Sequence, residues 1–481
     1  MGRPRKYGTA AEKAEARRAQ NRIHIRKWRA RKVAEEEERR SGVFTKFVAV
    51  ESPALTRRID TKSREVASVR LPLLPLATTK DPYELASFHY FRHHALRDLH
   101  GHFRVDFWQH YVLQAYHHEA AVRHSILALA AVHAAANTGI DLRKPSANSI
   151  DSLAEGHLTT WGLLQYNKAI KELQGSNLSE HTPATSARSR NVALICCILF
   201  VCIESMLDGR RAIDHMQSGI RLLQDSRSRL SDSDSSYVPD TVILEMFTRM
   251  DLLGTCWIVQ RRPQLVEAEA KIVDPVIQLP SFVLHPLQHV SVPTAFTSIG
   301  EARSTFERFF VAQLYLLGPQ RADLVWAEQE NPVPKEFFQP RLEWLREWQE
   351  ALDAHVVGLK RSRKFERHDA LAVELLGQHV TIAKGMAMTG NATNLFPACL
   401  DDELRKQVDL ARTSVTHMKG NGTRFSFELG SVPILYYIAM SAHDPGIRSD
   451  ALDVLDSYTW QDSLWRSDFA AKLVRDFNGL T

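Results

Sequence analysis

The feature that most constrains the fold is a succession of apolar segments with helical spacing. The run AAVRHSILALAAVHAAA at 120–136 is so rich in Ala and Leu that it is predicted to be buried on most sides, and the run at 192–203 carries no charge. Nine more segments are predicted as helices: 163–173, 212–223, 242–259, 299–317, 341–359, 370–388, 404–418, 447–457 and 464–478. No pair of alternating segments with a hairpin signal occurs, so the predicted fold class is all-α, an irregular multi-helix body.

Interruptions in this pattern predict the domain organisation. Polar segments at 144–152, 175–189 and 226–240 separate helices, and four prolines between 273 and 293 predict a long surface loop. Before residue 81 the pattern changes. Residues 41–80 lose the helical period and contain three prolines, which predicts a flexible linker between a basic helical arm, 1–40, and the body, 81–481.

The net charge of +5 conceals two populations of opposite sign. Residues 1–80 hold 21 basic and 9 acidic side chains, a net charge of +12, whereas the remainder holds 40 and 47, a net charge of −7. Positive charge gathered on an arm favours binding to a polyanion, because Lys and Arg displace counterions that are condensed on phosphates. The arm is therefore the predicted site of contact with nucleic acid.

The five cysteines favour a reducing compartment. Their number is odd, three of them lie in the apolar run at 192–203, and no pair has the C-x2-C spacing of a zinc site. Cys196, Cys197 and Cys202 are predicted to be inert and buried. The amino terminus lacks the apolar region of a signal peptide, and the run at 192–203 is about half of the ~20 residues that a bilayer requires, so no membrane partner is expected.

Residues 9–40 contain no Pro or Gly and are predicted to form one long helix. At about 100° per residue, Asn21 and Arg29 fall on one face, from which both reach base edges in a DNA major groove. Basic residues that flank this face are predicted to contact phosphates: Arg17, Arg18, Arg22, Arg26, Arg31 and Lys32. The bound partner would be double-stranded DNA.

The run RRAQNR at 17–22, with Asn21 and Arg29 in the N-x7-R spacing, resembles the basic region of bZIP transcription factors. His24 and Ile25 stand where that family has small or amide side chains, and Trp28 replaces a smaller residue. A leucine zipper does not follow, since EEEERR at 35–40 leads to glycine and proline within 15 residues. Dimerisation on two half-sites would have to come from another part of the chain.

A second basic motif, GRPRK at 2–6, resembles an AT-hook core. An extended Arg-Pro-Arg follows the narrow minor groove of A·T-rich DNA, so Arg3 and Arg5 are predicted minor-groove contacts. Three interpretations of the arm stay open: a DNA-contacting helix, a nuclear-import signal that grips phosphates without specificity, and a solvated charged helix. Basic residues outnumber acidic ones 14 to 6 over residues 1–40, which disfavours the last.

Short blocks in a fixed order along the body resemble the fungal-specific transcription factor domain. They are YFR at 90–92, FW at 107–108, VLQ at 112–114, AVRHSILALAAVH at 121–133, QYNKAI at 165–170, CILF at 197–200, HMQSGI at 215–220, PILY at 433–436 and DPGIR at 444–448. The resemblance implies an all-α regulatory domain of a nuclear regulator. That domain usually follows a six-cysteine zinc cluster, and this sequence has no such cysteine array.

Histidine is concentrated in one region, with ten of the 21 between residues 89 and 133. A metalloenzyme interpretation would place a metal at His89 and His93 with Glu119 nearby, but no H-E-x-x-H motif occurs, and clusters of this kind are usually surface chemistry. A P-loop, a G-x-S-x-G elbow and a Rossmann glycine pattern are also missing from the sequence. No catalytic residue, metal ligand or cofactor is predicted.

Together these features predict a nuclear, DNA-binding transcription regulator that is not an enzyme. The body would supply regulation through a homodimer, through other transcription regulators, or through a small-molecule effector. The alternative is a helical regulator that binds protein partners and has no DNA affinity of its own, its arm serving only for nuclear import.

Overall fold

The computed structural model describes residues 81–101, 103, 105–137, 150–176, 183–207, 209–227, 237–257, 264–267, 290–323, 339–389, 395–421 and 425–478. The predicted arm, 1–40, and linker, 41–80, lie outside these ranges, as does most of the predicted loop at 273–293. Internal contacts divide the chain into two units, residues 1–86 with 146–158 and residues 87–145 with 159–481. Both hydrophobic cores and the buried polar clusters of the body belong to the second unit.

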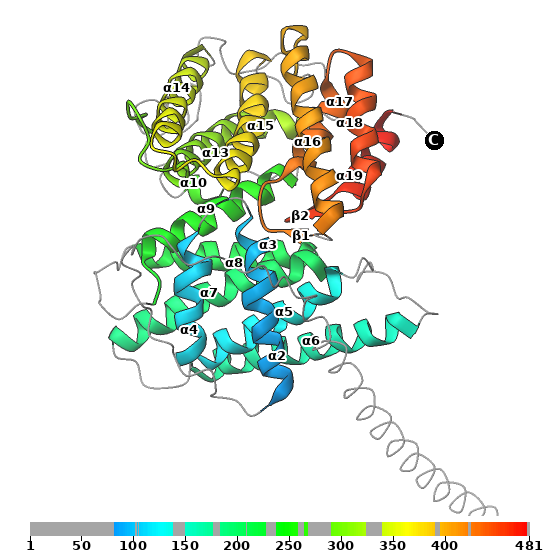
Figure 1. Ribbon diagram of the computed structural model, residues 1–481. Coiled ribbons are helices and arrows are strands. Elements are labelled where there is room, and N and C mark those ends of the chain that lie inside the picture. The colour runs from blue at the N-terminus through cyan, green and yellow to red at the C-terminus, as the bar shows by residue number, and fades with distance from the viewer. Residues whose placement is uncertain are drawn as a thin grey trace, which may run out of the picture. The chain divides into compact units, whose positions relative to one another are not determined.

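The described residues are predominantly helical, which confirms the all-α prediction (Figure 1). The first helices along the chain are α2 (Pro82–Tyr90), η1 (Phe91–Ala95), α3 (Leu96–His100), η2 (Phe107–Tyr111), α4 (Val112–His118), α5 (Ala120–Asn137), α6 (Ile150–Ser176), α7 (Pro183–Leu207), α8 (Gly209–Arg227), α9 (Asp240–Trp257) and α10 (Gln264–Glu267). They are followed by α13 (Ile299–Asp323), α14 (Gln339–Arg361), α15 (Arg367–Thr389), η4 (Ala398–Leu400), α16 (Asp401–Asn421), α17 (Ser431–Ser441), α18 (Pro445–Ser457) and α19 (Ser467–Asn478).

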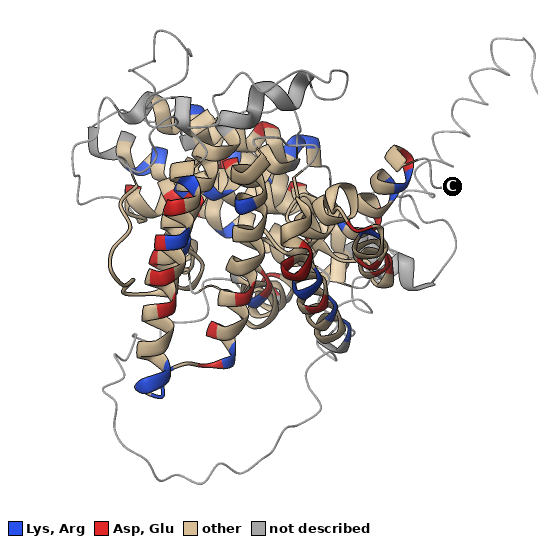
Figure 2. Ribbon diagram, turned by 90° about the horizontal axis from the view of Figure 1, so that it is seen from above, with Lys and Arg blue, Asp and Glu red and all other residues tan. Residues whose placement is uncertain are grey.

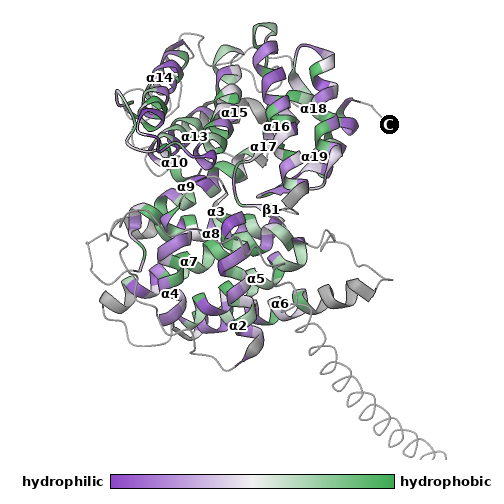
Figure 3. Cartoon of the chain, viewed as in Figure 1, coloured by the Kyte–Doolittle hydropathy of each residue, from purple (hydrophilic) through white to green (hydrophobic). Residues whose placement is uncertain are grey.

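Two hydrophobic cores lie inside the second unit. The first core is formed mainly by α5, α7, α8 and the start of α9, whose apolar residues gather between these helices (Figure 3). The second core contains α13 to α19 and four buried tryptophans, Trp344, Trp348, Trp460 and Trp465. The predicted core residues Phe107, Trp108 and Val112 are buried in the first core, as expected from their helical spacing.

Helix α9 belongs to both cores. Phe247 and Met250 pack in the first core, whereas Leu252, Leu253 and Cys256 pack in the second. Two other segments are divided between the cores in the same way. In one, Phe425 and Phe427 join the first core and Leu429 joins the second; in the other, Phe103 joins the second core and Phe107 joins the first. These three segments, 103–107, 247–256 and 425–429, therefore cross the boundary between the cores.

A small sheet occurs that the sequence pattern did not predict. Strand β1 (Phe425–Ser426) runs parallel to β2 (Gln461–Asp462), and β2 pairs in the antiparallel sense with β3 (Trp465–Arg466). In register, Phe425 faces Gln461, whose amide also donates to the Ser205 carbonyl oxygen at 2.7 Å at the end of α7. Strands of two residues are too short to show the alternation by which a strand is recognised in a sequence.

Several helices begin at capping side chains. Ser298 accepts a hydrogen bond from the Glu301 backbone N–H at 3.0 Å, and the Glu301 carboxylate accepts one from the Thr297 N–H at 2.7 Å, which is close to a capping box at the start of α13. Asp444 caps α18 by accepting from the Gly446 N–H at 2.7 Å, with proline at the first helical position.

Other differences from the sequence expectation concern helix ends. Helix α17 was not among the predicted helices, and α6 and α7 extend into the segments at 144–152 and 175–189 that were expected to be polar separators. Tertiary packing can carry a helix through polar residues once its apolar face is buried.

Helix α7 corrects one expectation about membranes. Among the helices of the described ranges, it alone is long and apolar enough to cross a bilayer by length and composition, over Ala187–Leu207, because it extends beyond the apolar run at 192–203. However, 78% of its apolar window is buried inside the protein, which is the behaviour of a core helix.

Candidate functional site

The predicted DNA-contacting residues lie outside the described part of the chain. This holds for the base contacts Asn21 and Arg29, the minor-groove contacts Arg3 and Arg5, and the phosphate contacts Arg17, Arg18, Arg22, Arg26, Arg31 and Lys32. Their roles stay predictions. The described residues instead show what the helical body contains, and its polar features fall into three buried clusters and a histidine-rich surface.

The surface histidines lie around α2 and η1. The rings of His89 and His93 are 4.2 Å apart at their centroids and both side chains are exposed. Within the described ranges, no group of three or more His, Cys, Asp or Glu side chains is placed to hold a metal ion. Burial and the neighbouring His89 and Arg92 lower the pKa of His93, so the His93 ring is mainly neutral at pH 7.

The first buried cluster surrounds His133 of α5. Its Nδ1 lies 3.2 Å from the Tyr90 hydroxyl and 3.3 Å from the Asn137 amide, and its Nε2 lies 3.5 Å from the Asp98 carboxylate. Burial lowers the pKa of His133 to about 3 and raises that of Asp98. The imidazole is therefore neutral, and its Nδ1 links α5 to Tyr90 at the end of α2.

The second buried cluster joins α6, α7 and α8. The Tyr166 hydroxyl lies 2.7 Å from Nε2 of His215, and the Tyr166 ring meets Phe200 edge to face at 4.6 Å. Burial and the Glu204 carboxylate raise the pKa of Tyr166, and burial lowers that of His215. Both groups are thus neutral at pH 7, which suits a hydrogen bond that sets the spacing of three helices.

The third cluster, called the ion network from here on, consists of Arg249, Arg303, Glu307 and Glu428. Arg303 Nε donates to Glu307 Oε1 at 2.7 Å, and Arg249 Nε donates to the same oxygen at 3.1 Å. The other face of the Arg303 guanidinium pairs with Glu428, with 3.2 Å between Nη1 and Oε1. All four side chains are buried, the most exposed at 9%. The two arginine cations and the two glutamate carboxylates therefore balance in charge.

The ion network lies at the boundary between the two cores. Arg249 belongs to α9 between residues of the two cores, Arg303 and Glu307 lie on α13 of the second core, and Glu428 lies between Phe427 of the first core and Leu429 of the second. It therefore joins two of the three boundary-crossing segments through one helix.

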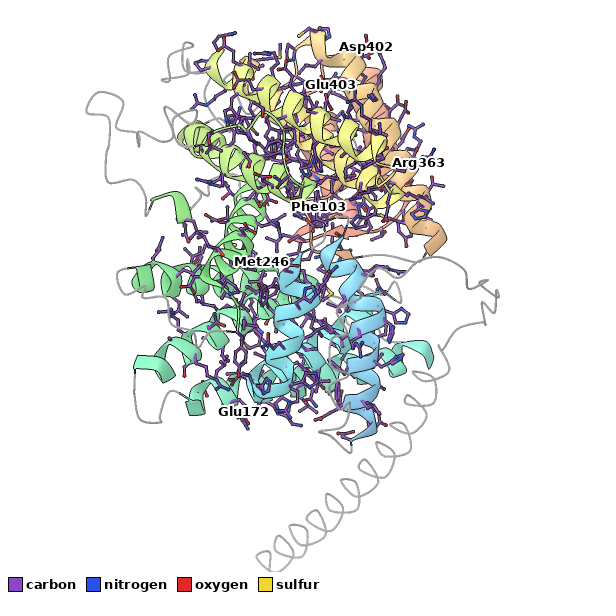
Figure 4. All side chains as sticks on the ribbon, turned by 60° about the vertical axis from the view of Figure 1, so that its left-hand side comes forward. Phe103, Glu172, Met246, Arg363, Asp402 and Glu403 are labelled. Atoms are coloured by element: carbon purple, nitrogen blue, oxygen red, sulfur yellow. The ribbon has the colours of Figure 1, made fainter. Side chains whose placement is uncertain are left out.

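The third boundary-crossing segment, 103–107, contributes Phe103, which covers the charged side chain of Arg303. The Phe103 ring lies against the Arg303 guanidinium, 3.9 Å from Cζ to the ring centroid, an arrangement in which the aromatic face attracts the cation. Gly101 has φ of +53°, and a Cβ there would come within 2.6 Å of Cγ of Glu428. Phe103 lies where the first helices of the chain meet those of the second core (Figure 4). All three segments thus converge on the ion network.

The two carboxylates of the ion network differ in their surroundings. Burial disfavours the charge of Glu307, but Arg249 and Arg303 outweigh it and lower its pKa. Glu428 pairs with Arg303, and there burial prevails and raises its pKa. Glu428 is thus the carboxylate whose charge the protein stabilises less, and it is also the member contributed by a non-helical segment.

Cys196 and Cys202 match their predicted role as buried thiols. Cys196, Cys202 and Cys256 are buried, Cys197 is half-buried and Cys399 is exposed. Burial raises the pKa of Cys197 to about 12 and raises those of Cys196 and Cys202 as well. Thiols of this kind are poor nucleophiles.

Sequence reasoning did not single out the members of the ion network. Arg303 and Glu307 are four residues apart, a spacing that also occurs on solvated helix faces. Arg249 likewise has acidic residues near it on its own helix, Glu245 and Asp251, so its sequence surroundings do not mark it as a buried charge. Glu428 gave no signal, since its partner lies 125 residues earlier in the chain.

Comparison with known proteins finds a similarity for part of the helical body. A model of the fungal specific transcription factor domain matches residues 87–282, which contain the first two buried clusters and Arg249. The match implies a transcription regulator, and with it a nuclear protein. The predicted blocks at 433–436 and 444–448 lie beyond the matched residues. No curated protein and no solved structure matches the chain.

Proposed function

We propose that this protein is a nuclear transcription regulator that binds double-stranded DNA through residues 1–40 and is regulated through its helical body. The observation that carries the proposal is the combination of a domain match at 87–282 with a net charge of +12 on residues 1–80. A regulatory domain of this kind needs a DNA-contacting element, and the chain has no six-cysteine zinc cluster to supply one. The basic arm is the segment whose charge and spacing fit that role.

In this proposal Asn21 and Arg29 contact base edges in the major groove, and the six flanking basic residues named above contact phosphates. Arg3 and Arg5 enter the minor groove. A single basic helix binds weakly, so the body also supplies the homodimer contact that places two arms on two half-sites. Catalysis and a bound cofactor have no part in this function.

The test is fluorescence anisotropy of full-length protein with duplex DNA at several salt concentrations. The logarithm of the binding constant should fall linearly with the logarithm of the salt concentration, with a slope of about −0.9 for each phosphate contact. Replacing Arg17 and Arg18 by Ala should reduce the slope by about 2 units. A matched control replaces Lys168 and Lys171 by Ala, two exposed cations of α6, and should leave the slope unchanged.

Two outcomes would redirect the proposal. If Asn21→Ala weakens cognate and random DNA equally, Asn21 does not read bases and the arm only grips phosphates. If full-length protein shows no DNA binding, while deletion of residues 1–40 removes it from the nucleus, the alternative holds: a helical regulator of protein partners whose arm is an import signal.

A further inference from the structure

Buried charges lie at the boundary between the two cores, beside apolar contacts such as those of Val105, which packs against both. Replacing a buried ion pair by apolar residues of similar volume is often neutral or stabilising, so burial of these charges is weak evidence that they serve stability. At this boundary the three crossing segments meet around Arg303, with Phe103 on its face and Glu428 at its end. These contacts of Arg303 with Phe103 and Glu428 are made in one relative position of the two cores.

The arginines of the ion network have carboxylates available within their own helices. Arg303 already pairs with Glu307 four residues later on α13. On α9, Glu245 precedes Arg249 by four residues, is exposed, and lies within electrostatic reach of Arg249 and Glu307. A glutamate four residues before a basic residue is the favourable order for a pair within a helix. Arg249 and Arg303 would thus keep a partner if the cores moved apart.

We propose that the ion network is a latch between the two cores, which opens when pairs between segments are exchanged for pairs within helices α9 and α13. In the latched state Arg249 pairs with Glu307 and Arg303 pairs with both Glu307 and Glu428. In the unlatched state Arg249 pairs with Glu245, Arg303 keeps Glu307, and Glu428 is released to water. In both states every buried charge has a partner. The exchange therefore avoids leaving an unpaired charge inside the protein, which is the main free-energy cost of opening a buried ion network.

The latch goes beyond DNA binding, because it concerns how the body changes its shape. Any ligand or partner that binds the unlatched state more tightly shifts the population toward it. In this proposal the exchange of ion pairs around Arg249 and Arg303 is the two-state element, and the packing of the crossing segments adjusts with it.

The test is double electron–electron resonance on the full chain, in a Cys399→Ser background that removes the exposed thiol. Spin labels at Arg221→Cys on α8 and Asp353→Cys on α14, both exposed, report the distance between the cores. Labels at Asp353→Cys and Lys406→Cys report a distance inside the second core. For each of the two label pairs, the wild-type protein should give a single main distance.

The variant Glu428→Gln should shift the equilibrium toward the unlatched state by about tenfold or more, because it weakens a hydrogen bond between charged groups. A second distance should then appear between the cores and not within the second core. Adding Glu245→Gln should reduce that second population. The control Glu350→Gln, which removes the carboxylate of the exposed Arg346–Glu350 pair, should leave both distances unchanged.

Two results would overturn the latch: a single unchanged distance between the cores in Glu428→Gln, or equal broadening within the second core. Should that variant not fold, native-state hydrogen exchange of the wild-type protein decides. Amides of residues 425–429 should exchange at lower denaturant concentration than those of α5 and α15. Exchange of all three only with global unfolding would show that no unlatched state exists.

Discussion

The Asp462 carboxylate fills the space that a side chain at Gly430 would need. A Cβ on Gly430 would lie 2.1 Å from Cγ of Asp462. The same carboxylate accepts hydrogen bonds from the Val432 N–H at 3.0 Å, in the first turn of α17, and from the Trp460 indole N–H at 3.1 Å. One buried acid thereby joins the start of α17 to the small sheet, and only a glycine lets it approach.

Gly430→Ala should lower the free energy of unfolding by about 1 to 3 kcal/mol, because the carboxylate or the backbone has to move. The matched control is Gly175→Ala on α6, where nothing lies within 4 Å of the added Cβ. That substitution should stabilise by up to about 1 kcal/mol through helix propensity. Urea unfolding of the full chain measures both, and equal effects would show that Asp462 does not occupy the site.

The stability that Asp462 contributes should depend on pH. Burial raises its pKa from 3.8 to about 6, so between these values the folded protein holds a proton that the unfolded chain has released. Stability from this group therefore falls as pH rises from about 4 to 6, by roughly 3 kcal/mol. Asp462→Asn removes this dependence. Its stability relative to wild type should increase across the same interval, and a constant difference from pH 4 to 7 would contradict the assignment.

Only one of the five thiols should react rapidly in the native protein. Cys399 is exposed, whereas burial raises the pKa of Cys196, Cys197 and Cys202, and Cys256 is buried. A thiol–disulfide reagent should titrate about one equivalent under native conditions and all five in denaturant. Cys399→Ser should abolish the fast phase. A fast phase that survives this substitution would identify an accessible thiol in the apolar run of α7.

Charge pairs across α16 and α18 should contribute little to stability. Arg412 lies 3.8 Å from Asp450, seven residues after Arg405, which pairs with Asp444. Both partners of the Arg412–Asp450 pair are more than half exposed, among helices that carry Lys and Arg interspersed with Asp and Glu (Figure 2).

Arg412→Ala should therefore change the free energy of unfolding by less than about 1 kcal/mol, and less at high salt. The buried counterpart is Arg249→Ala, which should cost about 3 to 5 kcal/mol because it removes a partner from Glu307 inside the protein. Thermal or urea unfolding distinguishes the two, and comparable losses would contradict the difference in burial.

Residues 120–136 show what sequence periodicity can establish. Their apolar pattern predicts a buried helix, and α5 occupies 120–137 with most of its side chains inside the first core. The same holds for the apolar run of α7 and the amphipathic segments of the second core. Helix formation is decided by residues three and four positions apart, which are neighbours in the sequence as well as in space.

Glu428 shows where such reasoning ends. Its neighbours Phe427 and Leu429 are apolar, but nothing near it in the sequence indicates that it completes an ion network with Arg303 or that it lies against Gly101. The small sheet is equally hard to predict from the sequence. Its strands are two residues long, and β1 and β2 pair although they lie 36 positions apart in the sequence. The short alternation at 425–429 names neither the partner strand nor the partner charge.

The sequence by itself determined that the body is helical, which residues of its long segments are buried, and that positive charge is concentrated on residues 1–80. These are properties of local spacing and composition. Only the tertiary structure decided that the body has two cores and that four charges at their boundary form one network. The physical reason is that a buried charge is tolerated only beside its partner, and partners distant in sequence become neighbours only when the chain has folded.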